Sequence, residues 1–117
     1  MNQRIITGRK NKYRNKKTVV DNITFHSKKE AAFYSEIKLL ERIGAIQNLE
    51  LQPVFEIIPT VEWNGKKLSA KKYIADFKFI EDGTEIVVDV KGIRTPAYIL
   101  KRQLFLIRYP EYVFREV

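Results

Sequence analysis

An aspartate and a lysine stand two positions apart at the end of an apolar run, E85-I-V-V-D-V-K-G92. The four aliphatic residues of this run indicate a buried strand. Side chains two positions apart on a strand point to the same face, so Asp89 and Lys91 are expected side by side. The structural interpretation is an ion pair at the end of a strand. The functional interpretation is a carboxylate and an ammonium placed for catalysis.

A second carboxylate is expected across a hairpin from the first. Asp82-Gly83 suits a two-residue turn, and this register places Asp76 directly opposite Asp89. Opposed residues on one face have Cβ atoms about 4.5–5.5 Å apart. Two carboxylates at that separation repel each other unless a cation lies between them. A three-residue loop would shift the register by one and place the two acids on opposite faces.

A third acid comes from a predicted helix at residues 27–43. The sequence S27-K-K-E30 has the spacing of a capping box, in which Glu30 reaches back to the helix start. Glu30 also precedes Phe33, Tyr34 and Ile37 by three, four and seven positions, which places it on the predicted core face. Capping alone would explain this glutamate, and capping and a role in a site can coexist.

These groups predict a hard-cation site. The chain has no cysteine and one histidine, so oxygen ligands from Asp76, Asp89 and Glu30 favour Mg²⁺ or Mn²⁺. Such an ion lowers the pKa of a bound water and neutralises charge on a phosphoryl transition state. A neighbouring lysine, here Lys91, can orient the water and stabilise developing charge. The predicted chemistry is phosphodiester hydrolysis.

The rest of the chain predicts the elements that position this site. Alternation and turn signals predict a hairpin at 18–25 around Asp21-Asn22, a strand at 49–58, a hairpin of 61–63 and a long strand 66–80 around Asn64-Gly65, and strands at 85–91 and 112–117. Helices are predicted at 27–43 and 97–108, the second capped by Thr95. This order indicates an α/β (α+β) fold with a mixed sheet flanked by two main helices. Residues 18–117 are expected to form a single domain, preceded by a flexible basic arm at residues 1–17.

These motifs together resemble the PD-(D/E)xK nuclease superfamily. More narrowly, S27-K-K-E-A, L51-Q-P, Y73-I-A-D-F, D89-V-K-G and T95-P resemble small phage and prophage proteins with a predicted nuclease domain, related to Holliday junction resolvases. The resemblance implies a restriction-endonuclease-like core with a four-stranded mixed sheet, Mg²⁺-dependent cleavage of branched DNA and a possible homodimer. It also implies that Glu30, Asp76, Asp89 and Lys91 are the catalytic residues. Ala75 stands where the motif usually has proline.

The basic charge of the chain is concentrated at its start. The net charge is +8, and residues 1–20 contain seven basic residues and no acid. A nucleic acid would neutralise such a segment; the alternative is a solubilising tail. The predicted DNA-binding residues are Arg9, Lys10, Lys12, Arg14, Lys16, Lys17 and Lys101, with Gln52 as an accessory residue and an exposed face as the alternative for Lys101.

Two further features lie on the hairpin around Asn64-Gly65. Lysines at positions 66, 67, 71 and 72 could follow a DNA backbone or be ordinary surface. Trp63 is expected to pack in the core, with base stacking or an interface as alternatives.

Three functions are compatible with these patterns. The first is a metal-dependent DNA endonuclease, encoded by a phage or prophage. The second is a non-catalytic nucleic-acid-binding protein on the same scaffold, and the third an adaptor that binds an acidic protein through the arm. No apolar run is long enough to span a membrane, so a cytoplasmic location without a membrane partner is expected.

Overall fold

The computed structural model describes residues 17–117 and has an α+β fold, as predicted. Contacts divide the chain into two compact units, residues 1–36 and 37–117, and each is described by itself. The elements are β1 (Thr18–Val20), β2 (Ile23–Phe25), α1 (Lys28–Arg42), β3 (Gln47–Leu51), β4 (Val54–Ile58), β5 (Val61–Trp63), β6 (Lys66–Leu68), β7 (Lys71–Ile74), β8 (Phe77–Glu81), β9 (Thr84–Asp89), α2 (Pro96–Arg108) and β10 (Val113–Glu116). No helix within residues 17–117 is long and apolar enough to cross a membrane.

The described part of the first unit contains the predicted hairpin and the start of α1. β1 and β2 pair around Asp21 and Asn22, which have φ values of 53° and 62°. Both values suit the tight hairpin turn expected there. The Tyr34 hydroxyl donates a 2.9 Å hydrogen bond to Asp21 and so fastens the turn to the helix.

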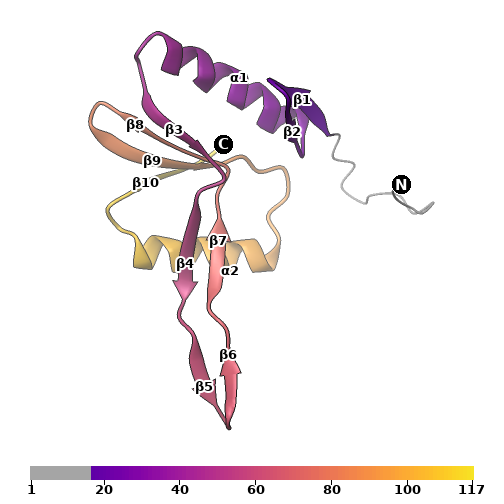
Figure 1. Ribbon diagram of the computed structural model, residues 1–117, viewed down its shortest axis with the longest axis vertical. Helices are drawn as coiled ribbons and strands as arrows, with labels where there is room; N and C mark the ends of the chain where they lie inside the picture. Colours follow the sequence, from indigo (N-terminus) through magenta and orange to yellow (C-terminus); the bar gives the residue numbers. More distant parts are fainter. Residues whose placement is uncertain (1–16) are drawn as a thin grey trace, which may run out of the picture. The chain divides into compact units, whose positions relative to one another are not determined.

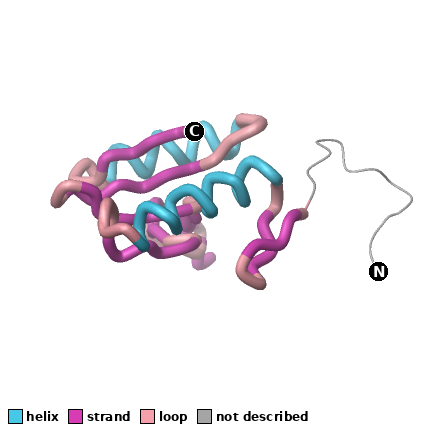
Figure 2. Tube along the Cα trace, turned by 90° about the horizontal axis from the view of Figure 1, so that it is seen from above, coloured by secondary structure: helices cyan, strands magenta, loops and turns pink. Residues whose placement is uncertain are grey.

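The second unit is built on a four-stranded mixed sheet of order β10-β9-β8-β3. β10 runs parallel to β9, whereas β9–β8 and β8–β3 are antiparallel. Figure 2 shows the C-terminal strand lying beside a neighbouring strand. The predicted register of the β8–β9 hairpin is confirmed from Glu81↔Thr84 to Phe77↔Val88. The turn residues Asp82 and Gly83 have φ values of 52° and 76°, as a two-residue turn requires.

The two long strands expected at 49–58 and 66–80 are both interrupted. The first breaks between β3 and β4, where Gln52 has a φ of 52°, and the second breaks before β8. Two hydrogen bonds join the breaks: Gln52 N–H donates to Asp76 O at 2.9 Å, and Ala75 N–H donates to Pro53 O at 3.1 Å. β3 therefore pairs with β8, while β4 leaves the sheet and pairs with β7. This second pair continues into the β5–β6 ribbon, at the bottom of Figure 1.

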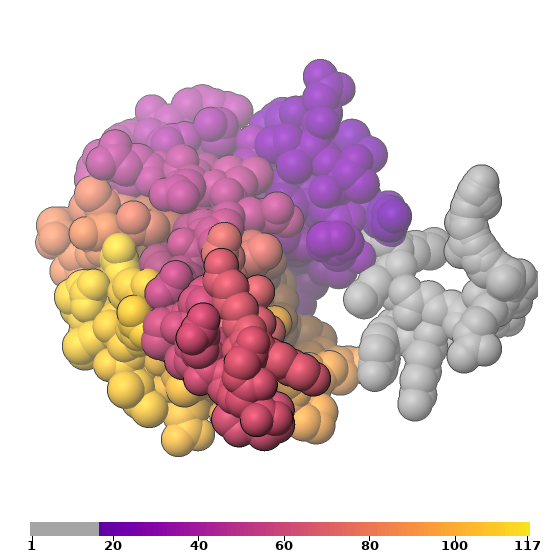
Figure 3. Space-filling view, turned by 60° about the horizontal axis from the view of Figure 1, so that its bottom comes forward, coloured from indigo at the N-terminus to yellow at the C-terminus, as the bar shows by residue number. Residues whose placement is uncertain are grey.

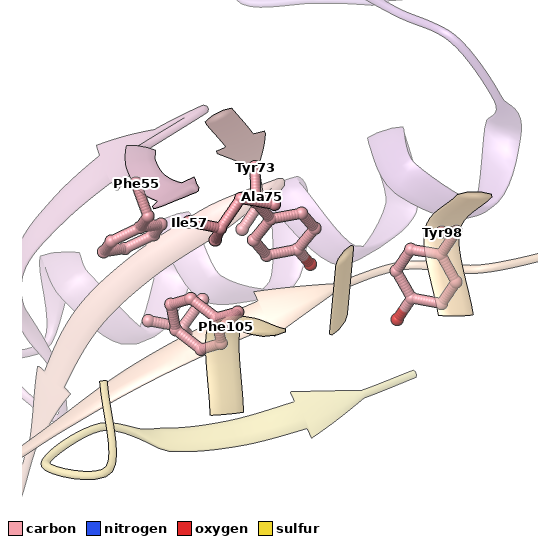
Figure 4. Close-up of a cluster of buried hydrophobic side chains, with 7 residues drawn as sticks. Phe55, Ile57, Tyr73, Ala75, Tyr98 and Phe105 are labelled. Carbon is pink, nitrogen blue, oxygen red and sulfur yellow. The ribbon is translucent and has the colours of Figure 1, made fainter. Parts of the chain in front are cut away.

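A core rich in aromatic rings forms where α2 packs against β4 and β7. Phe105 of α2 is fully buried, and its ring lies 4.8 Å from Phe55 and 5.4 Å from Tyr73 between ring centroids. Figure 4 shows the rings of Phe55, Tyr73 and Phe105 close together, with Tyr98 to one side, nearer the start of α2. The buried members of this core are Phe55, Ile57, Tyr73, Ala75, Val87, Tyr98 and Phe105. Val87 joins it from β9, so this face of the sheet looks toward α2.

The start of α2 is fixed by the predicted cap and by an ionic cluster on β10. Thr95 Oγ1 accepts a 3.1 Å hydrogen bond from Tyr98 N–H, and Pro96 follows in the first turn. Glu116 accepts hydrogen bonds from the Tyr98 hydroxyl at 2.5 Å, Arg94 at 2.8 Å and Arg102 at 2.9 Å. Chiefly through the Tyr98 bond, and then through the two arginines, the pKa of Glu116 falls from its ordinary value of 4.5 to about 2.

This shift predicts an acid-dependent loss of stability. A depressed carboxyl pKa stabilises the folded state above the ordinary value, and this contribution disappears as the pH falls from 4.5 toward 2. Glu116→Gln should therefore lower the thermal unfolding temperature by several degrees at neutral pH. The difference from the native protein should close in acid, as followed by circular dichroism. Glu111→Gln, an exposed glutamate just before β10, is the matched control; a Glu116→Gln difference that stays constant with pH would contradict the assignment.

Candidate functional site

Asp89 is a fully buried carboxylate at the end of β9. One of its oxygens, Oδ2, accepts a hydrogen bond from the Tyr73 hydroxyl. The other, Oδ1, has no hydrogen-bond partner within residues 17–117. Burying an ionised carboxylate costs free energy unless it is paired, so the surroundings of Oδ1 decide what this side chain can do.

Lys91 provides the positive charge nearest to that oxygen. Its Nζ lies 3.0 Å from Asp89 Oδ1, which is ion-pair distance, although it does not meet hydrogen-bond geometry. The same Nζ lies 4.1 Å from the centre of the Tyr98 ring, a cation–π contact. The side chain of Lys91 is 25% exposed. The expected neighbourhood of Asp89 and Lys91 is therefore confirmed, with an ammonium between a buried carboxylate and the surface.

Asp76 lies at the point where β8 and β9 part. The paired register ends at Phe77 and Val88, one position short of the predicted Asp76–Asp89 pair. Asp76 N–H donates to Val88 O at 3.0 Å, and its carboxylate Oδ2 accepts from Val90 N–H at 2.7 Å. The second acid thus binds the backbone immediately after Asp89.

The Tyr73 hydroxyl donates a hydrogen bond to Asp89, and its pKa is raised. Burial raises the pKa of Tyr73 most, followed by the hydrogen bond to Asp89 and its charge; the charge of Asp76 contributes in the same direction. The phenol therefore stays protonated and donates to Asp89. The pKa of Tyr98 is also raised, by burial first, then by its bond to Glu116 and the charge of Asp89.

Glu30 lies in the first unit, where Ser27 caps α1 as predicted, but its carboxylate binds one residue farther back than the capping box requires. Its N–H donates to Ser27 Oγ at 3.1 Å, and its carboxylate accepts from His26 N–H at 3.2 Å. It is 6% exposed, which confirms that it lies on a buried face of α1. The cap explains the position of Glu30, and its part in a metal site stays a prediction.

A basic cavity is lined by Tyr73 and Lys91, the two residues whose side chains contact Asp89. It has a volume of about 260 Å³, and Lys91, Lys72 and Lys101 are among the residues that line it, together with Tyr73 and Tyr98. A second, more apolar cavity of about 510 Å³ shares Lys72, Ala97 and Lys101 with the first, and runs between α2 and the β4–β7 pair. The three lysines make the lining of the smaller cavity positively charged, which favours anions.

The remaining predicted residues fall into three groups. Lys101 lies on the exposed side of α2 and reaches both cavities. Gln52 is exposed, and its backbone, held by Asp76, marks the break between β3 and β4. Arg9, Lys10, Lys12, Arg14 and Lys16 lie outside the described residues, whereas Lys17 is described and exposed.

Sequence reasoning assigned no role in the site to Tyr73 or Tyr98. Tyr73 stands three positions before Asp76, in a strand expected to run on without interruption. The strand break brings its hydroxyl to Asp89, and no local pattern indicates that break except Pro53. Tyr98 lies in the predicted helix at residues 97–108, where no local pattern assigns it to a site.

The donor set of the second unit fits a hard divalent cation. Asp89 Oδ1 is a buried carboxylate oxygen without a hydrogen bond within residues 17–117, and the Asp76 carboxylate accepts a hydrogen bond from Val90 N–H, on the residue after Asp89. Among the described residues, no group of three or more histidine, cysteine, aspartate or glutamate side chains gathers as a metal site. Mg²⁺ is commonly held by one or two carboxylates and completes its shell with water and substrate phosphate, so two carboxylates suit it.

Comparison with known proteins places the chain in a family without assigning an activity. No curated protein matches it. A family described as "Protein of unknown function (DUF1064)" matches residues 10–116, which includes the whole candidate site. The chain therefore belongs to the DUF1064 family.

Proposed function

We propose that the protein is a metal-dependent endonuclease that hydrolyses phosphodiester bonds in DNA. The observation that carries this proposal is the buried Asp89 carboxylate, which has one oxygen without a hydrogen bond and an ammonium 3.0 Å from it. Burying a charged carboxylate costs free energy unless it is paired, and here the Lys91 ammonium supplies the opposite charge. A carboxylate beside a second acid, a lysine and a basic cavity has the composition of a phosphoryl-transfer site.

Asp76 and Asp89 would hold Mg²⁺ or Mn²⁺, and Glu30 is the third ligand that the resemblance implies. Such an ion, when bound, supplies a more acidic water and charge neutralisation at the phosphate. Tyr73 keeps Asp89 oriented through its hydroxyl. Lys91, anchored on the Tyr98 ring, places its ammonium where it orients a water and stabilises charge that develops on the phosphate. Lys72 and Lys101, which line the same cavity, bind flanking phosphates.

The proposed substrate is branched DNA, on the resemblance to PD-(D/E)xK nucleases related to Holliday junction resolvases. The mixed four-stranded sheet is compatible with the restriction-endonuclease-like core that this resemblance implies. A phage or prophage origin, a cytoplasmic location and a homodimer belong to the same proposal.

We expect cleavage of a four-way DNA junction to require Mg²⁺ and to depend on Asp89 and Lys91. Asp89→Asn keeps the size of the side chain and an acceptor for Tyr73 but removes the charge; Lys91→Ala removes the ammonium. Each should reduce the single-turnover cleavage rate by about 10²–10³-fold, the usual effect of removing one stabilising group. Calorimetric titration with Mn²⁺ gives a second readout, because Asp89→Asn should lose binding without any substrate present.

Two exposed residues provide matched controls. Asp82→Asn makes the same chemical change in the exposed turn of the same hairpin, and Lys28→Ala removes an exposed lysine at the start of α1. Both should cleave at the native rate. Cleavage that persists in both Asp89→Asn and Lys91→Ala would refute the assignment of the site.

The basic segment before β1 supplies affinity without sequence specificity. Replacing its seven cations, Arg4 to Lys17, with glutamine should weaken DNA binding and reduce the slope of log K against log salt by up to about 6, at roughly 0.9 per phosphate contacted. Fluorescence anisotropy at several salt concentrations measures both. A scrambled arm of the same composition should bind like the native arm; an unchanged slope in the glutamine variant would indicate a solubilising tail.

A non-catalytic nucleic-acid-binding protein is the second candidate, and one observation favours it. Tyr73 and Lys91 already stabilise Asp89, and Val90 N–H already occupies an oxygen of Asp76. These contacts would also suit two structural acids. Binding of DNA without Mn²⁺ binding and without cleavage would identify this function.

A further inference from the structure

The ribbon formed by β5 and β6 exposes an apolar face that the proposed catalytic site does not use. The pairs Val61↔Leu68 and Trp63↔Lys66 lie on one face, because residues two apart share a side of a strand. Trp63 is 62% exposed, Val61 46% and Leu68 44%. The expectation that Trp63 packs in the core is therefore wrong. Figure 3 looks toward this ribbon, which comes forward in magenta and red.

A two-stranded ribbon with an exposed apolar face is not expected to be stable in water by itself. A two-stranded hairpin alone is marginally stable in water, and β5 and β6 pair only with each other among the described strands. Its attachment is narrow, since Ala70 N–H donates to Thr60 Oγ1 at 3.0 Å where β5–β6 meets β4–β7. An exposed tryptophan at the end of such a ribbon is accounted for by a partner that covers it.

The charge of the ribbon selects the partner. Residues 59–72, which comprise the ribbon and the adjoining start of β7, contain one acid, Glu62, and four exposed lysines, two on β6 at positions 66 and 67 and two on β7 at positions 71 and 72. A second copy of the ribbon would bring the same positive charges together, and this repulsion disfavours self-association. A polyanion that also offers flat apolar surfaces satisfies both the lysines and the indole.

We propose that this ribbon binds DNA at unpaired bases, with Trp63 stacked on a base and the four lysines on the flanking phosphates. Stacking on an aromatic side chain does not depend on which base is present, and lysine contacts to phosphate carry no sequence information. The ribbon would therefore recognise DNA that exposes unstacked bases, as a branch point does. This inference rests on the proposed function only in taking DNA as the partner.

Trp63 makes its own test possible, because it is the only tryptophan in the chain. The native protein is titrated in EDTA, which prevents cleavage, with a single-stranded oligonucleotide and with a fully paired duplex of the same sequence. Tryptophan emission should be quenched as the single strand saturates, and less by the duplex. Emission that does not change at saturation would overturn the proposal. Emission that instead shifts with protein concentration in the absence of DNA would also overturn it, in favour of an interface between copies.

Substitutions separate stacking from charge. Trp63→Ala should weaken single-strand binding by about 5- to 150-fold, the range for loss of one stacked base, while Trp63→Phe should bind close to the native level. Replacing Lys66, Lys67 and Lys71 with glutamine, while keeping Lys72 because it also lines the cavity of the proposed catalytic site, should reduce the salt slope by up to about 2. Ile107→Ala, at a 69% exposed position of α2, is the matched control. Equal binding by Trp63→Ala and the native protein would refute the proposal.

The ribbon proposal and the nuclease proposal can fail separately, because the tryptophan measurements do not depend on cleavage. Quenching and a Trp63→Ala defect without any Mg²⁺-dependent cleavage would keep the ribbon as a DNA-binding surface and reject the nuclease. Mg²⁺-dependent cleavage with unchanged tryptophan emission would keep the nuclease and reject the ribbon.

Discussion

The second unit depends on the burial of one charge, the carboxylate of Asp89. A fully buried acid is tolerated only when neighbouring groups satisfy it, and here Tyr73 and Lys91 approach its two oxygens from different elements. Tyr73 reaches it from β7, so β7 must pass close to the end of β9. Lys91 reaches it from the loop after β9, where Tyr98 of α2 supports the ammonium. One charge thus determines how a strand, a loop and a helix meet.

The breaks between β3 and β4 and between β7 and β8 allow β7 to pass close to the end of β9. Had residues 66–80 formed one regular strand, the backbone of residue 75 would have continued the ladder with β9. Instead Ala75 N–H bonds to Pro53, and the Asp76 carboxylate takes the N–H of Val90. The Asp76 side chain thus accepts the hydrogen bond from Val90 N–H that a backbone carbonyl would accept in a continuous ladder. The separation gives Tyr73 its place over Asp89 and opens the cavity that Lys72, Lys91 and Lys101 line.

The sequence predicted those parts of the site that depend on local rules. Asp82-Gly83 determined the hairpin register, Ser27 and Glu30 the cap of α1, and Thr95 the start of α2. The period of two placed Asp89 and Lys91 together. The exchange of pairing partners at Pro53 and Ala75 could not be predicted, because an apolar alternation continues across both breaks and only tertiary packing against α2 selects the new partner. For the same reason the sequence predicts no role for Tyr73 in the site and wrongly places Trp63 in the core.

The β4–β7 pair connects the catalytic proposal with the ribbon. Along β7 the burial alternates: Tyr73 points into the aromatic core and binds Asp89, whereas Lys72 and Ile74 on either side of it are exposed. The same few residues therefore hold the buried carboxylate and carry the basic surface outward to β6. A strand used on both faces leaves little freedom in its register, because a shift by one residue would remove the hydroxyl from Asp89 and bury a lysine in its place. The ribbon is joined to β7, and the contacts that hold Tyr73 against Asp89 also fix β7. The same contacts therefore set the direction in which the β5–β6 ribbon extends.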